Sequence, residues 1–271
     1  MLKANFENIY VYPGHDVLIV PLDGRKYSYS VQDENVVKIT GNKIVYLSDG
    51  ETRVEARLNG DVYSFNVFSR KNFRFENDML KVKERIISDK ANERHPTVFM
   101  GDSFFQFWRD GTNGVTLFKD DFKGKDFFNI GVSATTTHDW RTSLEDTLYL
   151  INPKAIVLNI GINNVDDLHE NGDELILSLL TLLTQIHNHY PNLIIYYISI
   201  TRCTNDFSKN WEKHRKSNEF FRNYASEHSF LRFLDLNSLY NDENAALQAD
   251  GLHPNNMGYR RFKELIDKNV D

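Results

Sequence analysis

The chain has almost no cysteine and no long apolar run. Cys203 is the only cysteine among 271 residues, so no disulfide can form within the chain. No segment reaches the roughly 20 apolar residues that a membrane-spanning helix needs. The first residues, Met1–Glu7, lack the apolar core of a secretory signal. We therefore expect a cytoplasmic protein; a chain whose signal had been removed would look the same, so a secreted or surface location stays open.

A basic excess is also missing. The chain has 38 acidic and 32 basic residues and a formal net charge of −6, so we expect no nucleic-acid partner held through its phosphates. It has neither a phosphate-binding glycine loop nor a dinucleotide-binding motif. His187 and His189 are two residues apart in a helical pattern and do not share a face, which makes them poor metal ligands. We expect neither a cofactor nor a metal, and the oligomeric state is not indicated.

Residues 1–70 have the pattern of a small all-β domain. Apolar and polar residues alternate from Tyr27 to Val31, from Val54 to Leu58 and from Tyr63 to Val67. Asn59-Gly60 lies between the last two segments and predicts a hairpin. Short strands separated by turn residues are typical of a β-sandwich.

The layout of this region resembles a bacterial Ig-like domain of group 2. The likeness lies in an expected strand over Asp33–Val37, a short hairpin through Gly41, and a segment from Gly50 to Val54 that leads into the last pair. Such domains often act as spacers or supports. A platform packed beside a second domain is the role that we expect, with independent glycan or partner binding as the alternative.

The pattern changes at residue 71, and residues 71–271 predict an α/β domain. Continuously apolar runs alternate with helical patterns, which is typical of a parallel sheet covered on both faces. The expected strands are Thr97–Met100, Phe127–Ile130, Ala155–Ile160, Leu193–Ile200 and Leu231–Leu234. The expected helices are Asp78–Ile87, Asp139–Ile151, Asp173–His189, Trp211–His228 and Asn256–Lys268. Ligands of such sheets bind at the carboxyl ends of the strands.

Two short segments carry the residue types needed for acyl transfer through a covalent ester. Gly101-Asp102-Ser103 directly follows the first expected strand, and Asp250-Gly251-Leu252-His253-Pro254 precedes the last expected helix. A serine hydroxyl is a poor nucleophile unless a nearby base removes its proton. An imidazole suits that task, and a carboxylate fixes its tautomer and stabilises the imidazolium. Asp102 itself is expected to cap the following helix or brace its loop.

Four segments in the same order resemble the blocks of the SGNH, or GDSL, hydrolase family. They are Val98–Ser103, Asn129–Ser133 with Thr135–Thr137, Ile156–Asn164, and Asp250–Asn255 with Gly258-Tyr259. The resemblance covers about residues 95–268 and implies a flavodoxin-like, three-layer α/β/α domain. Asn164 stands where many members have Asp, which favours the branch that resembles platelet-activating-factor acetylhydrolase.

The resemblance also implies a role for each matching residue. Ser103 is the expected nucleophile, His253 the general base and acid, and Asp250 the residue that orients the imidazole. The expected oxyanion donors are the backbone N–H groups of Ser103 and Gly131 and the side-chain amide of Asn163. Glycine at position 131 would let the backbone approach the substrate carbonyl closely.

The substrate is less well defined. Trp108 follows the nucleophile segment, and Trp140 follows the Gly131 segment. The two indoles either form an aromatic platform for a sugar at the rim of the site or pack in the core. Arg202 either meets an acidic group of the substrate or is solvated. We expect a serine esterase for short acyl groups, acetyl above all, on a carbohydrate or similar polar alcohol. The alternatives are a lipase- or thioesterase-like acylhydrolase, an acyltransferase, and a glycan- or partner-binding protein with a secondary hydrolase domain.

Overall fold

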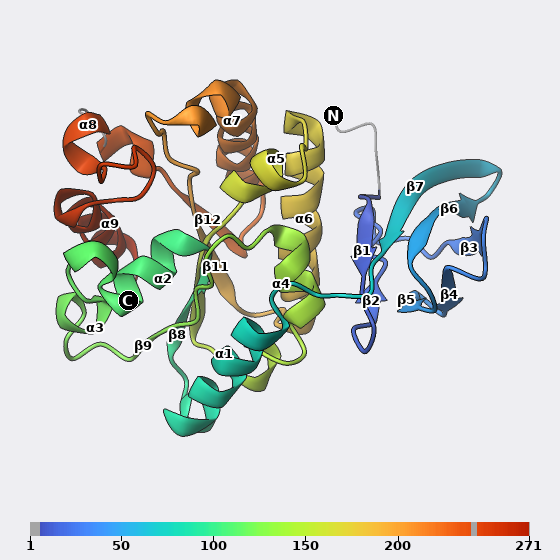
Figure 1. Cartoon of the computed structure of the whole chain (residues 1–271), viewed down its shortest axis with the longest axis horizontal. Helices are drawn as coiled ribbons and strands as arrows, with labels where there is room; N and C mark the ends of the chain where they lie inside the picture. Colours follow the sequence, from blue (N-terminus) through green and yellow to red (C-terminus); the bar gives the residue numbers. More distant parts are fainter. Residues whose placement is uncertain (1–5, 240–242, 271) are drawn as a thin grey trace.

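The computed structural model describes residues 6–239 and 243–270, and its N-terminal part consists of strands (Figure 1). Four of them form a mixed sheet in the order β1-β7-β6-β3, in which β1 and β7 are parallel and the other pairs antiparallel. Three form an antiparallel sheet in the order β2-β5-β4. The strands are β1 (Ile9–Val11), β2 (Val17–Leu18), β3 (Ser28–Val31), β4 (Val37–Thr40), β5 (Lys43–Tyr46), β6 (Gly50–Leu58) and β7 (Asp61–Ser69).

Local turn chemistry explains where the strand predictions in this part are right and where they are wrong. The Asn59-Gly60 hairpin is confirmed: it joins β6 to β7, and both residues have positive φ (52° and 93°), as a two-residue hairpin turn requires. The strand expected over Asp33–Val37 is wrong, because residues 33–36 form a turn before β4. Asp33 Oδ1 accepts the N–H of Asn35 at 2.9 Å, and this side-chain bond replaces strand pairing.

The rest of the chain is built on a five-stranded parallel sheet in the order β12-β11-β10-β8-β9. Counted along the chain, this is the flavodoxin-like order 2-1-3-4-5, and all five expected strands are confirmed. The strands are β8 (Thr97–Gly101), β9 (Phe127–Asn129), β10 (Ala155–Asn159), β11 (Ile194–Ile198) and β12 (Leu231–Leu234). The helices are α1 (Glu76–Ser88), α2 (Ser103–Asp110), α3 (Phe118–Asp121), α4 (Thr137–Ser143), α5 (Ile162–Asp167), α6 (Gly172–His189), α7 (Trp211–Glu227), α8 (Glu243–Ala246) and α9 (Asn256–Asn269).

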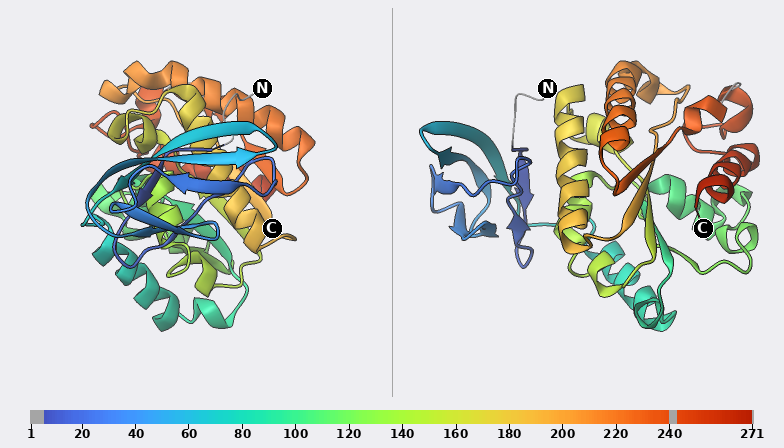
Figure 2. Two further views of the ribbon diagram at one scale, coloured as in Figure 1. Left: turned by 90° about the vertical axis from the view of Figure 1, so that its right-hand side faces the viewer. Right: turned by 180° about the vertical axis from the view of Figure 1, so that it is seen from behind.

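Helices cover both faces of the sheet, as predicted. α2, α3 and α9 lie on one face, and α4, α6 and α7 lie on the other, which is the side of the N-terminal strands (Figures 1 and 2). The strand order reverses between β8 and β10, the point at which open α/β sheets bind their ligands. Ser103 follows β8 directly, and Asn163 follows β10, so the fold brings these two segments to one edge.

The helix expected over Asp139–Ile151 is shorter than predicted. A capping box between Thr136 and Asp139 starts α4 at Thr137, and the helix ends at Ser143. The Ser143 hydroxyl donates to the Asp139 carbonyl at 3.0 Å, and the Thr147 hydroxyl donates to the Ser143 carbonyl at 2.6 Å. Hydroxyl groups that bond to the backbone compete with the helical pattern, and a 3₁₀ turn at Leu148–Leu150 follows.

The buried apolar side chains form two clusters. One contains residues from 6 to 67 of the N-terminal strands, and the other contains residues from 73 to 270. The N-terminal strands meet α4 through Arg141, which forms a buried ion pair with Glu7 and donates to the Leu18 carbonyl at 2.5 Å. A boundary at residue 70 between independent domains stays a prediction. Among the described residues, no helix is long and apolar enough to cross a membrane.

Candidate active site

The turn from β8 into α2 presents Ser103 at the first position of a helix. Gly101 is required there, since an added Cβ would lie 2.1 Å from the carbonyl oxygen of Asn159 in β10. Asp102 caps α2 by accepting the Phe104 N–H at 3.1 Å, which confirms its expected role. Its carboxyl is fully buried, and this burial raises its pKa to about 7. Ser103 itself is 8% exposed, so the hydroxyl lies at the floor of the site.

A continuous hydrogen-bond chain joins Ser103 to the loop between α8 and α9. His253 Nε2 lies 2.9 Å from Ser103 Oγ, and His253 Nδ1 lies 2.6 Å from Asp250 Oδ2. Asp250 Oδ1 also accepts the backbone N–H groups of Leu252 and His253 at 2.9 and 3.0 Å. The structure therefore brings Ser103 next to His253, which lies 150 positions later in the sequence and contacts its neighbour Asp250.

The electrostatics of this loop keep Asp250 ionised. Partial burial opposes the charged form, but hydrogen bonds from His253 and from the backbone of Leu252 and His253 outweigh it and lower the pKa of the Asp250 carboxyl. The loop is held by Gly251, whose carbonyl accepts the Thr204 N–H at 2.7 Å. Gly251 has a φ of +67°, and a Cβ there would lie 2.7 Å from Thr204 Oγ1, so glycine is required.

An aromatic side chain that the sequence analysis missed packs on the imidazole. The Phe107 ring is stacked on His253, with centroids 4.3 Å apart and an interplanar angle of 25°. Phe107 lies four residues after Ser103 in α2, so both side chains project from the same helix face. The sequence feature that could have predicted this contact is the four-residue spacing, which places an aromatic ring one helical turn beyond the nucleophile.

The loop after β9 holds Gly131 for a different reason from the expected one. A Cβ at Gly131 would lie 2.7 Å from Phe105 Cβ and 2.9 Å from Gln106 N, so the glycine permits close packing against α2. The Gly131 N–H already donates to Asn129 Oδ1 at 2.9 Å. The Gly131 N–H is therefore engaged within the protein, and its expected role as an oxyanion donor stays a prediction.

The next two N–H groups of this loop are also engaged within the protein, whereas those of Ala134 and Thr135 have no hydrogen-bond partner among the described residues. The Val132 N–H donates to the Gly101 carbonyl at 3.0 Å, and the Ser133 N–H donates to Gln106 Oε1 at 2.7 Å. Ala134 has a φ of +60°, and its N–H has no hydrogen-bond partner among the described residues. Its carbonyl accepts Arg74 Nη2 at 2.6 Å.

The first turn of α5 supplies Asn163 beside this loop. Asn163 is 7% exposed, and its Nδ2 donates to the Thr135 carbonyl at 3.0 Å. The neighbouring Asn164 is fully buried; its Oδ1 accepts the Thr137 N–H at 3.1 Å, and its Nδ2 donates to Glu170 Oε2 at 3.0 Å. Asn164 thus ties the start of α4 to α5 and leaves Asn163 next to the Ala134 loop.

Two of the three residues expected to contact substrate lie in the core, and the prediction for Arg202 stays a prediction. Trp108 and Trp140 are fully buried, and their indole N–H groups donate to Asp121 Oδ2 at 2.7 Å and Thr135 Oγ1 at 3.1 Å. Both rings are core side chains, so neither forms a platform at the rim. Arg202 is exposed in the loop after β11, with its guanidinium 5.0 Å from the centroid of the Trp211 ring.

The acidic, histidine and cysteine side chains give no metal centre within the described ranges. No group of three or more of them is placed to hold a metal ion in residues 6–239 and 243–270. The described part of the site thus consists of one hydroxyl, one imidazole, one carboxylate and a set of amide donors.

Comparison with family models gives a match over more than half of the chain. The family model described as GDSL-like Lipase/Acylhydrolase family matches residues 99–261. A search of curated proteins found no match to this chain.

Solved structures with similar folds have low sequence identity to this chain. A GDSL-like lipase from Bacteroides thetaiotaomicron VPI-5482 is 20% identical, with a TM-score of 0.57, over 69% of this chain and 95% of that one. A carbohydrate esterase of family 3 from Talaromyces cellulolyticus is 17% identical, with a TM-score of 0.53, over 65% and 96% of the two chains. An acetyl esterase variant with an acetate ion is 16% identical, with a TM-score of 0.53, over 65% and 96%. At these identities the likeness shows the fold.

Proposed function

Because the chain belongs to the GDSL-like lipase/acylhydrolase family, we propose that it is a serine esterase in which Ser103, His253 and Asp250 form the catalytic triad. The observation that carries the proposal is the hydrogen-bond chain through these three residues, with distances of 2.9 and 2.6 Å. Both distances lie in the range that proton transfer and imidazole orientation require.

The chemistry follows from this geometry. Ser103 Oγ attacks the ester carbonyl while His253 Nε2 takes its proton, and Asp250 stabilises the resulting imidazolium. Collapse of the tetrahedral intermediate breaks the bond to the alcohol, which leaves with the proton from His253 and leaves the acyl group on Ser103. Water then attacks the acyl-enzyme with His253 as base, and the carboxylic acid departs as the Ser103 hydroxyl is restored.

The oxyanion is stabilised by the N–H of Ser103, the side-chain amide of Asn163 and the N–H of Ala134. Ala134 takes the place that the sequence predicted for Gly131, because the Gly131 N–H is engaged by Asn129 and the Ala134 N–H has no partner among the described residues. The bond from Asn163 Nδ2 to the Thr135 carbonyl supports this assignment, since it holds Asn163 beside the Ala134 peptide. Donors fixed before the reaction stabilise developing charge at little reorganisation cost.

The proposed substrate is a short-chain ester, an acetyl group on a carbohydrate or similar polar alcohol. Two proteins of similar fold, a carbohydrate esterase and an acetyl esterase, support this choice. A lipase- or thioesterase-like preference for longer chains is the alternative.

The N-terminal strands form an Ig-like platform in this proposal, and their two sheets around one buried cluster support that role.

The test compares wild type with Ser103→Ala on p-nitrophenyl acetate, butyrate and octanoate. We expect the wild type to prefer acetate, and Ser103→Ala to lose at least 10³-fold in kcat, since removal of a nucleophile leaves only residual catalysis. A rise in kcat/KM beyond butyrate would instead favour the long-chain alternative. Wild-type activity in a folded Ser103→Ala protein would overturn the mechanism.

A further inference from the structure

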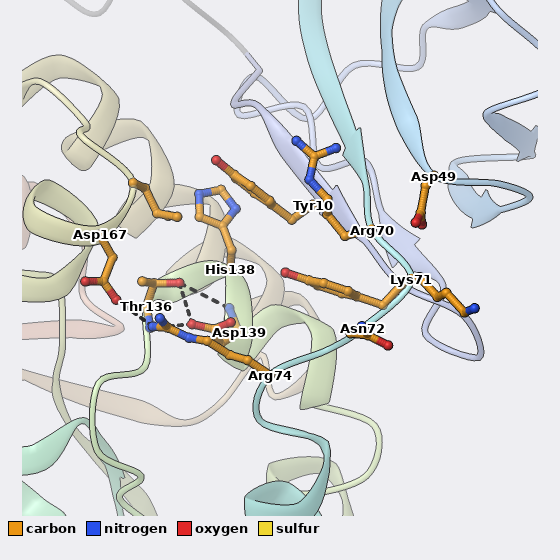
Figure 3. A pocket seen from close by; sticks show the side chains of 12 residues that line it. Tyr10, Asp49, Arg70, Lys71, Asn72, Arg74, Thr136, His138, Asp139 and Asp167 are labelled. Carbon is orange, nitrogen blue, oxygen red and sulfur yellow. Dashed lines mark hydrogen bonds and ion pairs between the residues drawn. The ribbon is translucent and has the colours of Figure 1, made fainter.

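A cavity of about 400 Å³ lies where the N-terminal strands meet the α/β part. Tyr10 and Tyr12 line it from the N-terminal strands, Lys71 and Arg74 from the segment that leads to α1, and Thr136 and Asp167 from the α/β part (Figure 3). Ligand sites commonly form at such junctions, because two units supply walls to one space. Nothing in the hydrolytic steps described above uses this cavity.

The cavity lies close to two proposed oxyanion donors through two short connections. Thr136 is two residues beyond Ala134, so their Cα atoms are at most about 7 Å apart. Asp167 is four residues beyond Asn163 in α5, a rise of about 6 Å along the helix. The lining of the cavity therefore begins two residues after Ala134 and about one helical turn after Asn163, the two proposed oxyanion donors.

Arg74 occupies the junction between the cavity and the Ala134 loop. Its Nη2 donates to the Ala134 carbonyl and to Asp167 Oδ2, both at 2.6 Å, and Figure 3 shows the contact with Asp167. This guanidinium still has further N–H donors to offer to a ligand in the cavity.

The charged groups around the cavity are mostly paired within the protein, which argues against a small free ion as the ligand. Arg74 is paired with Asp167, Arg70 with Glu51 at 2.6 Å, and Asp139 accepts the N–H and hydroxyl of Thr136 at 2.8 Å. A neutral ligand with many hydroxyl groups can still bond to the remaining donors and acceptors of these groups.

The two tyrosines add hydroxyl groups and aromatic surface of the kind that suits such a ligand. Neither the Tyr10 nor the Tyr12 hydroxyl has a hydrogen-bond partner among the described residues, although both line the cavity. Burial raises the pKa of Tyr12 far above its usual value, so its hydroxyl stays a neutral donor. A sugar ring offers hydroxyls at its edge and an apolar C–H face, which match these phenols in both respects.

We propose that this cavity binds the sugar ring next to the acetylated one, so that the protein acts on O-acetylated oligosaccharides in preference to acetylated monosaccharides. The inference rests on the esterase activity proposed above and gives the N-terminal strands a direct part in substrate selection. Tyr12 and Lys71 bind the neighbouring ring, and Arg74 lies at the linkage between the two rings.

The test measures kcat/KM on mono-O-acetylated oligomers of xylose, glucose and N-acetylglucosamine, each from one to four sugars long. For the wild type we expect kcat/KM to rise at least tenfold from one sugar to two in one or more of the three series. In Tyr12→Phe and Lys71→Ala this length dependence falls to less than threefold, because the second ring loses a hydroxyl or ammonium partner. The matched controls are Tyr29→Phe on β3 and Lys38→Ala on β4, which do not line the cavity and keep the wild-type dependence.

The outcomes separate this inference from the proposed function. A flat length dependence in all three series, with Ser103-dependent hydrolysis of p-nitrophenyl acetate intact, would overturn the cavity proposal alone. A wild-type length dependence retained in both Tyr12→Phe and Lys71→Ala would also overturn it. Failure of every ester to react in a Ser103-dependent way would overturn the esterase activity itself. Thermal unfolding of each variant shows whether a loss reflects the cavity or the fold.

Discussion

The Phe107 ring is stacked on the His253 imidazole, with the ring centroids 4.3 Å apart. His253 must keep one nitrogen on Ser103 and the other on Asp250, and a flat apolar neighbour restricts its rotation without competing for either hydrogen bond. Phe107 is therefore a positioning residue in the proposed mechanism.

We expect Phe107→Ala to lower kcat about 10- to 100-fold, because a small misplacement of a catalytic group has costs of this order. Phe107→Leu retains apolar contact without the flat face and should lie between Ala and wild type. Steady-state kinetics on p-nitrophenyl acetate measure the effect, with Phe220→Leu on α7 as the control. If Phe107→Ala changed KM alone, the ring would bind substrate and not position His253.

The spacing of two aromatic residues shows what the sequence could and could not predict. Phe107 and Trp108 follow Ser103 by four and five residues in the same helix, but only the four-residue spacing returns to the Ser103 face. Nearness in sequence suggested Trp108 as a rim residue, whereas its ring lies in the core. The helix face, not the distance along the chain, decides which side chain reaches the site, and the sequence analysis gave no range for the helix after Asp102.

The parallel sheet was predictable because each of its strands is a continuously apolar run, and its carboxyl edge followed from the rule for parallel strands. Ser103, His253 and Asp250 could be proposed from the sequence because their neighbours form short motifs. By contrast, the parallel pairing of β1 with β7 joins segments far apart in the chain, and no local pattern encodes it. The bond that engages the Gly131 N–H is local, since its acceptor Asn129 lies two residues earlier, but the residue types alone did not indicate it.

Asn163 provides a direct test of the oxyanion donors. Asn163→Ala removes the side-chain amide from the site and should lower kcat by roughly 10²–10³ with little change in KM, since the donor acts mainly on the developing oxyanion. Asn164→Ala is an informative comparison, because Asn164 is buried and bonds to Thr137 and Glu170. Its loss should appear chiefly as a lower Tm. An Asn163→Ala protein with wild-type kcat would exclude the amide as a donor.

The left-handed conformation of Ala134 leads to a prediction about the loop. Its φ is +60°, which costs an L-residue roughly 1–2 kcal/mol, and a β-branched side chain tolerates it still less. Ala134→Gly should therefore retain activity and stability, whereas Ala134→Val should lower both kcat and the free energy of unfolding. Urea unfolding and p-nitrophenyl acetate kinetics measure the two effects. Equal kcat values for the Val and Gly variants would argue against a role for the Ala134 N–H.

The buried Asp102 makes stability depend on pH in an identifiable way. Burial raises its folded-state pKa to about 7, from an unfolded value near 3.8. Between these values the folded chain holds a proton that the unfolded chain has released, so stability falls as pH rises from about 4 to about 7. The three-unit difference corresponds to roughly 4 kcal/mol.

Asp102→Asn should remove this fall, because asparagine does not ionise and can still accept the Phe104 N–H as a helix cap. The variant should therefore equal wild type near pH 4 and be the more stable protein at pH 8. Urea unfolding across this range gives the comparison, with the exposed Asp206→Asn as the control. If the free energy of unfolding of Asp102→Asn and of wild type varied with pH in parallel, ionisation of Asp102 would cost the folded protein little free energy.

The ion pair between Glu7 and Arg141 joins the N-terminal strands to α4, and both side chains are almost wholly buried. Removal of one partner leaves the other charge buried and uncompensated, which typically costs about 3–5 kcal/mol. We therefore expect Glu7→Gln and Arg141→Met each to lower the free energy of unfolding by about this amount. The double variant should be less destabilised than the sum of the two, since it leaves no buried charge. Additive losses in this double-mutant cycle would mean that the two side chains act independently.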